Sequence, residues 1–498
     1  MADEKEVVPD EKTIIRSLLS PTIVLDDIIL EDLYEGTSDK LTNNKGAETG
    51  RQYQNNLGTE YPLVTINGYV FTKEEIVEFS LNANGFIPSI RIKVELTNSS
   101  VFKSQSFPKD GDIMSIFIRA KNDAFKPIRN DYLITSVDAG KGKIEGRGSD
   151  IVMSGELFIP KFYDETIKSY KGTSIDVLKK LCTEFGLGFA TNEKDTDDEQ
   201  IWLCAGDSIR NFVNHIAAHS WKDEKSFFTC YIDVYYHLNF VNVNNQLDSA
   251  GVMTAALLDT AALQDFNSGE KLVESSQTKT KKLLTDFKSA YGTNMFITTY
   301  EVKNNSSEIS REYGYKSFAQ FFDQKSLKLW EIFVDPIISE EAAKNKMILK
   351  GRSAPKAPDG KSAEKYWQTQ NKKYWMGVQY KDVHDKYIYA KLWNERNLAE
   401  IEKMYVECEI IKWNPNIYRG EKIPLILVTQ SDQTQRISDA TPGESGVGTN
   451  DPIVVANQLY SGYYMVCGIS INYTMLESNS LKETFRLTRR EWPVPATG

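Results

Sequence analysis

Apolar and polar residues alternate along the first third of the chain, and this pattern predicts β-strands. Residues 77–81 and residues 90–96 each alternate, and Asn84-Gly85 between them supplies a turn. A period of two buries one face of a strand and leaves the other in solvent. A second hairpin is predicted from Tyr132 to about residue 148. The pattern therefore predicts a small antiparallel β-domain over residues 62–164.

The period changes to that of a helix after this region. Thr173 or Ser174 caps a predicted helix that ends at Gly186, and Ser208 caps another one. Residues 228–240 then alternate over the longest such stretch in the chain, which predicts one long strand that bends near Asp233. Residues 165–260 are therefore expected to form an inserted α+β domain.

The β pattern returns near the C-terminus. Strands are predicted at residues 375–380, 387–392 and 405–411, with a short helix at 395–403 and a closing antiparallel pair near residues 463–488. We expect a second β-domain over 375–498 and a second inserted or connecting region over 261–374. Residues 1–61 are expected to form an N-terminal arm, either as a loose terminus or folded against a neighbouring subunit.

One motif occurs twice, once in each of the predicted β-domains. Residues 111–118 begin with Gly-Asp and precede a strand at 132–138, which starts with tyrosine. Residues 420–427 begin with Gly-Glu and precede a strand at 464–470, which also starts with tyrosine. Such an internal echo indicates two related β-domains in one polypeptide.

Composition restricts the possible partners. The 498 residues are 41% apolar, and the net charge of −10 argues against tight binding to a nucleic-acid backbone. No apolar run approaches the ~20 residues that cross a bilayer, and the acidic N-terminus does not resemble a signal peptide, so we expect no membrane contact and folding in a cytoplasm. The five cysteines lack C-x-x-C spacing, which favours reduced, buried thiols.

Catalytic and metal-binding patterns are weak. His215 and His219 share one side of a predicted helix, which suits either a metal site or a domain-packing pair, but no glutamate follows the first histidine. The acidic run 195–199 lacks the glycine of a calcium loop and is expected to be a solvated hairpin tip. Nucleophile-elbow, Walker and dinucleotide motifs do not occur. We therefore expect no enzyme and no cofactor.

Several segments resemble the central baseplate hub proteins of contractile-tailed bacteriophages. The similarity lies in residues 172–188, 202–221 and 231–242, in 394–424, and in the closing segments 461–466 and 487–493. The resemblance implies a mainly β, α+β fold with two tube-type antiparallel β-barrel domains and an inserted α+β domain, whereas the expected N-terminal arm has no counterpart in the family. It also implies relatives among the spike proteins of type six secretion systems.

The resemblance implies a homotrimer located in the tail baseplate of a virion and assembled in the host cytoplasm. The expected partners are the hexameric tail tube protein, the trimeric central spike protein, baseplate wedge proteins and a tape-measure protein, while DNA passes through without specific binding. The predicted interface residues lie on strands of both β-domains: Ile90, Ile92, Val94, Ile116, Ile118, Val406, Cys408, Leu425 and Leu427. The loop 429–450 is a candidate docking element. A virion-associated cell-wall hydrolase and a carbohydrate-binding adhesin remain as alternatives.

Overall fold

The computed structural model describes residues 62–489 with gaps. The described ranges are 62–96, 102–118, 128–139, 149–247, 283–284, 295–305, 308, 312, 316–334, 372–410, 413, 417–430, 454–456, 460, 462–475 and 481–489. The predicted N-terminal arm and most of the loop 429–450 lie outside these ranges.

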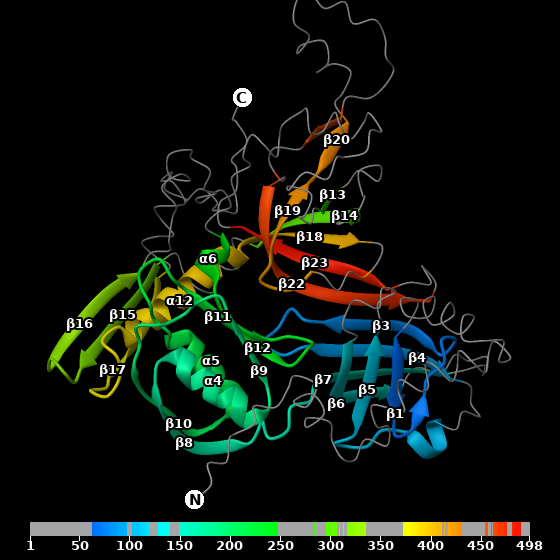
Figure 1. Cartoon of the computed structure of the whole chain (residues 1–498), viewed down its shortest axis with the longest axis horizontal. Coiled ribbons are helices and arrows are strands. Elements are labelled where there is room, and N and C mark those ends of the chain that lie inside the picture. Colours follow the sequence, from blue (N-terminus) through cyan, green and yellow to red (C-terminus); the bar gives the residue numbers. More distant parts are fainter. Residues whose placement is uncertain are drawn as a thin grey trace, which may run out of the picture.

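One large curled sheet dominates the fold (Figure 1). Its first half contains β1 (Leu63–Ile66), β2 (Tyr69–Val70), β3 (Ile76–Asn82), β4 (Ser89–Leu96), β5 (Ile113–Ile118), β6 (Ile128–Ala139) and β7 (Ser149–Leu157). Its second half contains β13 (Leu283–Leu284), β14 (Met295–Asn304), β18 (Met404–Ile410), β19 (Lys422–Ile426), β22 (Gly462–Thr474) and β23 (Lys482–Thr488). The strand order is β19-β13-β14-β18-β23-β22-β3-β4-β7-β6-β5-β1-β2.

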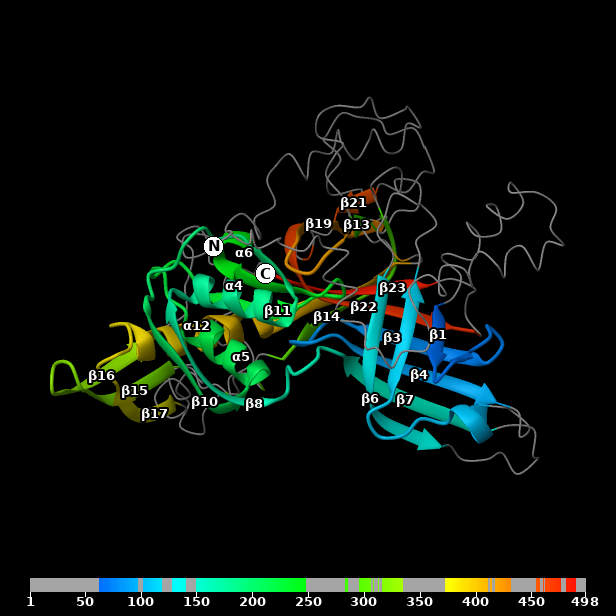
Figure 2. The ribbon, with the colours of Figure 1, turned by 60° about the horizontal axis from the view of Figure 1, so that its bottom comes forward.

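The strands of this sheet are antiparallel, except that β13 runs parallel to both of its neighbours. β19 also pairs with β22, so the strands of the second half form a closed circuit of pairings. Figure 2 shows the blue and cyan strands of the first half continuing directly into the red strands β22 and β23. The fold is therefore mainly β, with a large sheet that curls into a half-barrel.

A helix-containing segment follows β7. It comprises β8 (Glu165–Gly172), α4 (Ser174–Phe185), β9 (Gly188–Thr191), β10 (Gln200–Ser208), α5 (Ile209–His219), β11 (Phe228–Ile232), β12 (His237–Asn242) and α6 (Val243–Leu247). Thr173 caps α4 through a capping box and Gly186 ends it in a left-handed conformation, while Ser208 caps α5. These helix limits match the sequence predictions.

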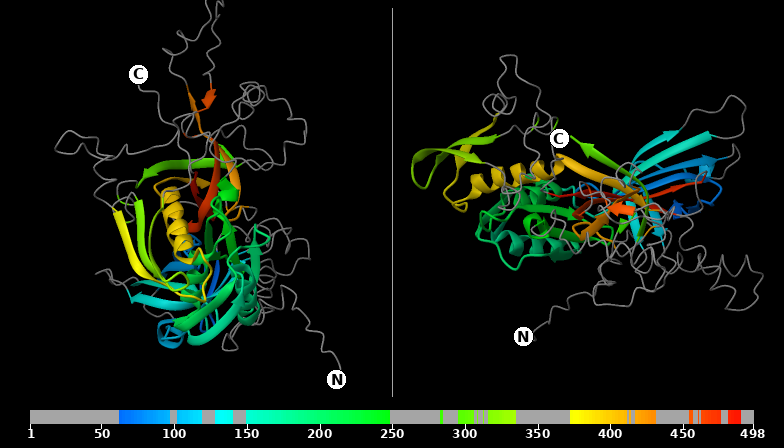
Figure 3. Two further views of the ribbon diagram at one scale, coloured as in Figure 1. Left: turned by 90° about the vertical axis from the view of Figure 1, so that its left-hand side faces the viewer. Right: turned by 90° about the horizontal axis from the view of Figure 1, so that it is seen from above.

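A second small layer packs on this segment. β15 (Lys316–Asp323), β16 (Lys328–Val334) and β17 (Lys372–Gln379) form a three-stranded sheet against the long helix α12 (Tyr387–Glu402). Figure 3 shows α12 running between this sheet and helices α4 and α5. The remaining described strands, β20 (Val428–Gln430) and β21 (Val454–Ala456), form a hairpin that leads into the 429–450 loop.

The structure corrects three local predictions. The stretch 228–240 is a hairpin of two strands, because Tyr236 adopts a left-handed φ of 61° and reverses the chain. Residues 387–392 are helical, since their apolar side chains pack in the core around α12. The acidic run is not wholly solvated: Asp198 is buried and accepts the backbone N–H groups of Ser174 and Trp221, at 2.9 and 3.0 Å.

Candidate assembly interface

Both copies of the Gly-acidic motif fold into the same turn. Gly111 and Gly420 have φ angles of 86° and 85°, a left-handed conformation that favours glycine. Asp112 donates its backbone N–H to the carbonyl of Lys109 at 3.0 Å, and Glu421 donates its backbone N–H to the carbonyl of Tyr418 at 3.2 Å. In return, the Asp112 carboxylate accepts the N–H of Lys109 at 2.6 Å, and the Glu421 carboxylate accepts that of Tyr418 at 3.3 Å.

The strands that follow the two turns pair in the same register. Met114 of β5 lies opposite Tyr132 of β6, and Ile423 of β19 lies opposite Tyr464 of β22, each three residues after the motif glycine. The residue two after each tyrosine donates its N–H to the carbonyl of the acidic residue, at 3.1 and 2.8 Å. Burial raises the pKa of both tyrosines, so both remain neutral anchors.

The correspondence extends over five strands in the same chain order, with β3, β4, β5, β6 and β7 matching β14, β18, β19, β22 and β23. The strand pairs β6–β7 and β22–β23 each contain a β-bulge, where the register leaves out the third residue after the motif tyrosine. The β3–β4 and β14–β18 pairs skip Val77 and Thr298, which are equivalent positions. Shared bulges fix the alignment, since a slip of one residue turns every side chain to the other face.

The two five-strand units differ most in the connection between their first two strands. A short turn joins β3 to β4, whereas residues 305–403, including the β15–β17 sheet and α12, lie between β14 and β18. The ends of this insertion meet where Asn305 donates its backbone N–H to the carbonyl of Lys403 at 2.7 Å. The strand at 295–304, which the sequence placed in a connecting region, therefore belongs to the large sheet.

The two units join where β22 continues past its pairing with β19 and pairs on the same side with β3. Polar side chains face one another on one side of this junction: the hydroxyl of Ser470 donates to Asn82 Oδ1 at 2.6 Å, and the hydroxyl of Ser80 donates to Asn472 Oδ1 at 2.8 Å. On the other side, the β22 residues Ile471 and Tyr473 enter the hydrophobic core of the first unit.

The structure places the nine predicted interface side chains in the interior of the chain. All nine are buried: Ile90, Ile92, Val94, Ile116, Ile118, Val406, Cys408, Leu425 and Leu427. The register makes Ile90 equivalent to Val406 and Ile92 to Cys408. Since these side chains contact their own cores, only the polar faces and the edges of the same strands remain available to a neighbouring protein.

A second candidate surface is the outer face of the β15–β17 sheet. Its inner face is buried against α12 through Ala319, Phe321 and Val334. The outer face presents large apolar side chains that the register places together, and these are Phe322, Leu329, Phe333, Tyr374, Met376 and Val378. Exposed apolar patches of this kind commonly mark protein contacts, although the described residues do not show what covers this one.

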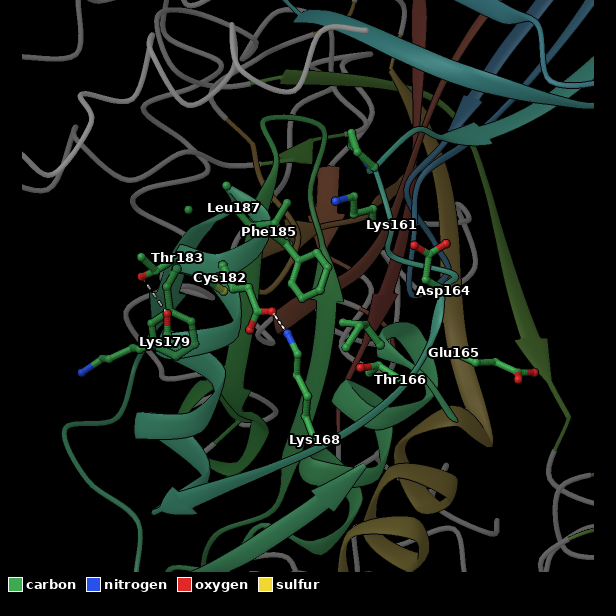
Figure 4. A pocket seen from close by; sticks show the side chains of 16 residues that line it. Lys161, Asp164, Glu165, Thr166, Lys168, Lys179, Cys182, Thr183, Phe185 and Leu187 are labelled. Atoms are coloured by element: carbon green, nitrogen blue, oxygen red, sulfur yellow. Dashed lines mark hydrogen bonds and ion pairs between the residues drawn. The ribbon is translucent and has the colours of Figure 1, made fainter. Parts of the chain in front are cut away.

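A groove of about 1020 Å³ lies beside α4 (Figure 4). Lys168 on β8 forms an ion pair with Glu184 on α4, and this hydrogen bond lowers the pKa of Glu184. The Cys182 thiol lines the groove, but burial raises its pKa, so the reactive thiolate is suppressed. The residues that line the groove supply no histidine beside a nucleophile.

The two candidate metal ligands face Tyr387 of α12. The ring of His219 stacks on the Tyr387 ring at 3.8 Å between centroids, and its Nδ1 lies 3.0 Å from the Tyr387 carbonyl. Nε2 of His215 lies 2.9 Å from the Tyr387 hydroxyl. Burial lowers the pKa of both imidazoles. No cluster of three metal-binding side chains occurs in the described parts of the chain, and the geometry is that of a packing contact.

Sequence reasoning missed the edge residues Tyr300 and Lys303 of β14. Alternation in residues 297–301 is typical of a strand, but it gives no sign of which sheet the strand joins. Among the described helices, none is long and apolar enough to cross a membrane.

Comparisons with known proteins give similarity in structure alone. No protein-family model and no curated sequence matches the chain. The structure is similar to the tail protein from Neisseria meningitidis MC58, with 9% identity, a TM-score of 0.44, and coverage of 86% of this chain and 96% of that one. It is also similar to the 43 kDa tail protein of prophage MuSo2 from Shewanella oneidensis, with 8% identity and a TM-score of 0.45. That match covers 86% of this chain and 98% of the tail protein. The match to the half-lidded Francisella PdpA-VgrG complex has 9% identity and a TM-score of 0.37, and it covers 96% of this chain and 66% of the matched chain.

Proposed function

We propose that this chain is a structural hub of a phage tail baseplate, with two tube-type β-barrel domains. The observation that carries the proposal is the five-strand unit that occurs twice with the same turns, register and bulges. The first domain spans residues 62–164. The second comprises β13, β14 and residues 404–498, with 165–260 and 305–403 as insertions.

A duplicated unit suits a protein that connects two symmetries. Three chains in a ring present six similar units, which can match a hexameric tail tube, while the insertions keep threefold symmetry and can seat a trimeric spike. Ring closure also covers strand edges that would otherwise promote aggregation. Wedge and tape-measure proteins are further partners in this proposal, and DNA passes through the acidic ring without specific binding.

The proposed role is structural, without catalysis. The pKa of the Cys182 thiol is raised in the groove, and the histidines pack against Tyr387, so neither feature supports the hydrolase alternative. The proposed location is the tail baseplate of the virion.

The mass of the purified particle tests the proposal. Light scattering is expected to give about 170 kDa, three times the 56.6 kDa chain, and electron microscopy of the particle is expected to show six similar lobes around an axis. Mixing with the tail tube protein is expected to produce a larger complex that contains one tube hexamer per trimer. A monomer at all concentrations, or a twofold particle, would contradict the proposal.

A further inference from the structure

The junction between the two units inside the chain shows how one unit completes another. β22 belongs to the second unit, yet its last residues pair with β3 and place Ile471 and Tyr473 in the core of the first unit. Phe79 of β3 lies opposite Tyr473 and is 1% exposed. The end of β22, a strand of the second unit, thus completes the hydrophobic core of the first unit.

The second unit has an equivalent edge at β14, but no strand of another unit pairs with that edge among the described residues. β14 is equivalent to β3, and Tyr300 is equivalent to Phe79, since Tyr300 lies opposite Cys408 and Phe79 lies opposite Ile92. Tyr300 is 43% exposed. β13 pairs with β14 only at residues 295–296, so within the described structure the edge along residues 299–303 has no strand partner on that side.

The first unit carries the strand end that would fill this edge. β6 is equivalent to β22, and its residues Asp138 and Ala139 correspond to Ser470 and Ile471, six and seven residues after the motif tyrosine. Beyond Ile134, β6 has no strand partner on the side of β5 among the described residues. Within one chain the two edges are separated by six strands, on the order of 30 Å along the sheet, so β6 cannot pair with its own β14.

We propose that a second copy of this chain adds the end of its β6 to the open edge of β14, with Asp138 opposite Lys303 and Ala139 opposite Val302. This inference rests on the proposed ring and assigns the contact that closes it. The contact joins two different surfaces, and contacts of that kind form a ring when the rotation closes.

The chemistry of the two edges agrees with this register. Asp138 and Lys303 stand where Ser470 and Asn82 hydrogen-bond in the internal junction. Within the chain, Lys303 forms ion pairs with Glu407 and Glu301, so Asp138 of the second copy joins this existing charge cluster. Val302, half-buried against the core of the second unit, stands where Leu81 lies. Opposite charges directly across a strand pair are favourable.

The register also fixes the geometry of a cross-link. In the internal junction Ala83 donates its backbone N–H to the carbonyl of Ile469, at 2.8 Å. The adjacent pair, Ser470 and Asn82, is therefore a non-hydrogen-bonded pair, whose Cα atoms are typically about 4.5 Å apart. The pair of Asp138 and Lys303 inherits this geometry, which lies within the range a disulfide spans.

The test is a double variant, Asp138→Cys with Lys303→Cys, oxidised in the purified particle. We expect covalent dimers and trimers on a non-reducing gel, and mass spectrometry is expected to find residue 138 joined to residue 303. The matched control is Asp138→Cys with Glu301→Cys, which shifts the register by two residues and separates the Cα atoms by about 7–8 Å, too far for a disulfide. Each single variant controls for linkage to the native cysteines.

The outcomes separate this inference from the proposed function. A trimer by light scattering that cross-links at 138–303 at least ten times more than at 138–301 supports both. A trimer that cross-links equally at both pairs, or at neither, overturns the register and leaves the hub proposal standing. A monomeric wild-type protein overturns both. Because a cysteine variant can fail to fold, hydrogen exchange of the wild type provides a second measurement. The backbone N–H of Val302 must become protected when the trimer forms, and unchanged exchange at Val302 refutes the contact.

Discussion

The duplicated turn offers a matched pair of glycines for one substitution. Gly111 and Gly420 share a left-handed φ, but an added Cβ meets nothing within 4 Å at Gly111, whereas at Gly420 it comes within 2.8 Å of the Tyr231 hydroxyl. That hydroxyl is held in place, because it donates to the Arg419 carbonyl at 2.5 Å, while the Arg419 guanidinium lies 4.0 Å from the centre of the Tyr231 ring. Gly420→Ala therefore adds a clash to a strain that both sites share.

The expected difference in stability follows from these contacts. A left-handed alanine costs about 1–2 kcal/mol, and the smaller entropy of the unfolded chain returns about 0.4–1 kcal/mol, so Gly111→Ala should cost about 1 kcal/mol. At Gly420 the displaced tyrosine adds about 1–3 kcal/mol of overpacking and about 0.5–1.5 kcal/mol from its hydrogen bond. Gly420→Ala should therefore destabilise the protein by about 2–4 kcal/mol more than Gly111→Ala does.

Urea unfolding, followed by tryptophan fluorescence and circular dichroism, measures both variants under one condition. Tyr231→Phe removes the oxygen that the new methyl group meets, so the double variant with Gly420→Ala should be more stable than the sum of the single effects by at least about 1 kcal/mol. Equal costs at the two glycines, or strict additivity with Tyr231→Phe, would refute the reasoning.

Three further predictions concern the packing of the inserted segments. Asp198→Ala leaves two buried N–H groups without their charged acceptor, and we expect a loss of about 3–5 kcal/mol in urea unfolding, with an exposed change such as Asp195→Ala as the neutral control. Asn394→Ala removes an amide that accepts one backbone N–H and donates to carbonyls at the end of α5; we expect a loss of about 2–3 kcal/mol, and a loss below 0.5 kcal/mol would contradict the assigned role. Burial holds the pKa of His219 well below 6.5, so the unfolded chain binds more protons as the pH falls below 6.5, and stability should decline by up to about 1.4 kcal/mol per pH unit for this group until its folded pKa is reached. His219→Gln should flatten the slope of melting temperature against pH between 6.5 and 5, and an unchanged slope would count against the burial argument.

Local patterns along the chain were sufficient to predict many elements. Period-two alternation located β3 and β4, and capping residues located both ends of α4. The echo of Gly, acidic residue and tyrosine identified the two related regions, since the left-handed turn requires glycine and its geometry depends on neighbours in sequence. Patterns failed at residues 387–392, where a helix buried on several sides has no simple period.

The sequence by itself determined strands such as β3 and β4, the helix caps, the paired turns and the mainly β character, because each depends on interactions within a few residues. Only the tertiary structure decided that β14 lies beside β18 across about a hundred residues of insertion, that the nine predicted interface side chains are core, and that β22 closes the first unit. Alternation along a strand shows which residues share a face. It does not show which strand is the neighbour in the sheet, or whether the apolar face packs against the same chain or against another protein. Those choices follow from long-range pairing, which also leaves residues 299–303 of β14 without a strand partner on one side in the described structure.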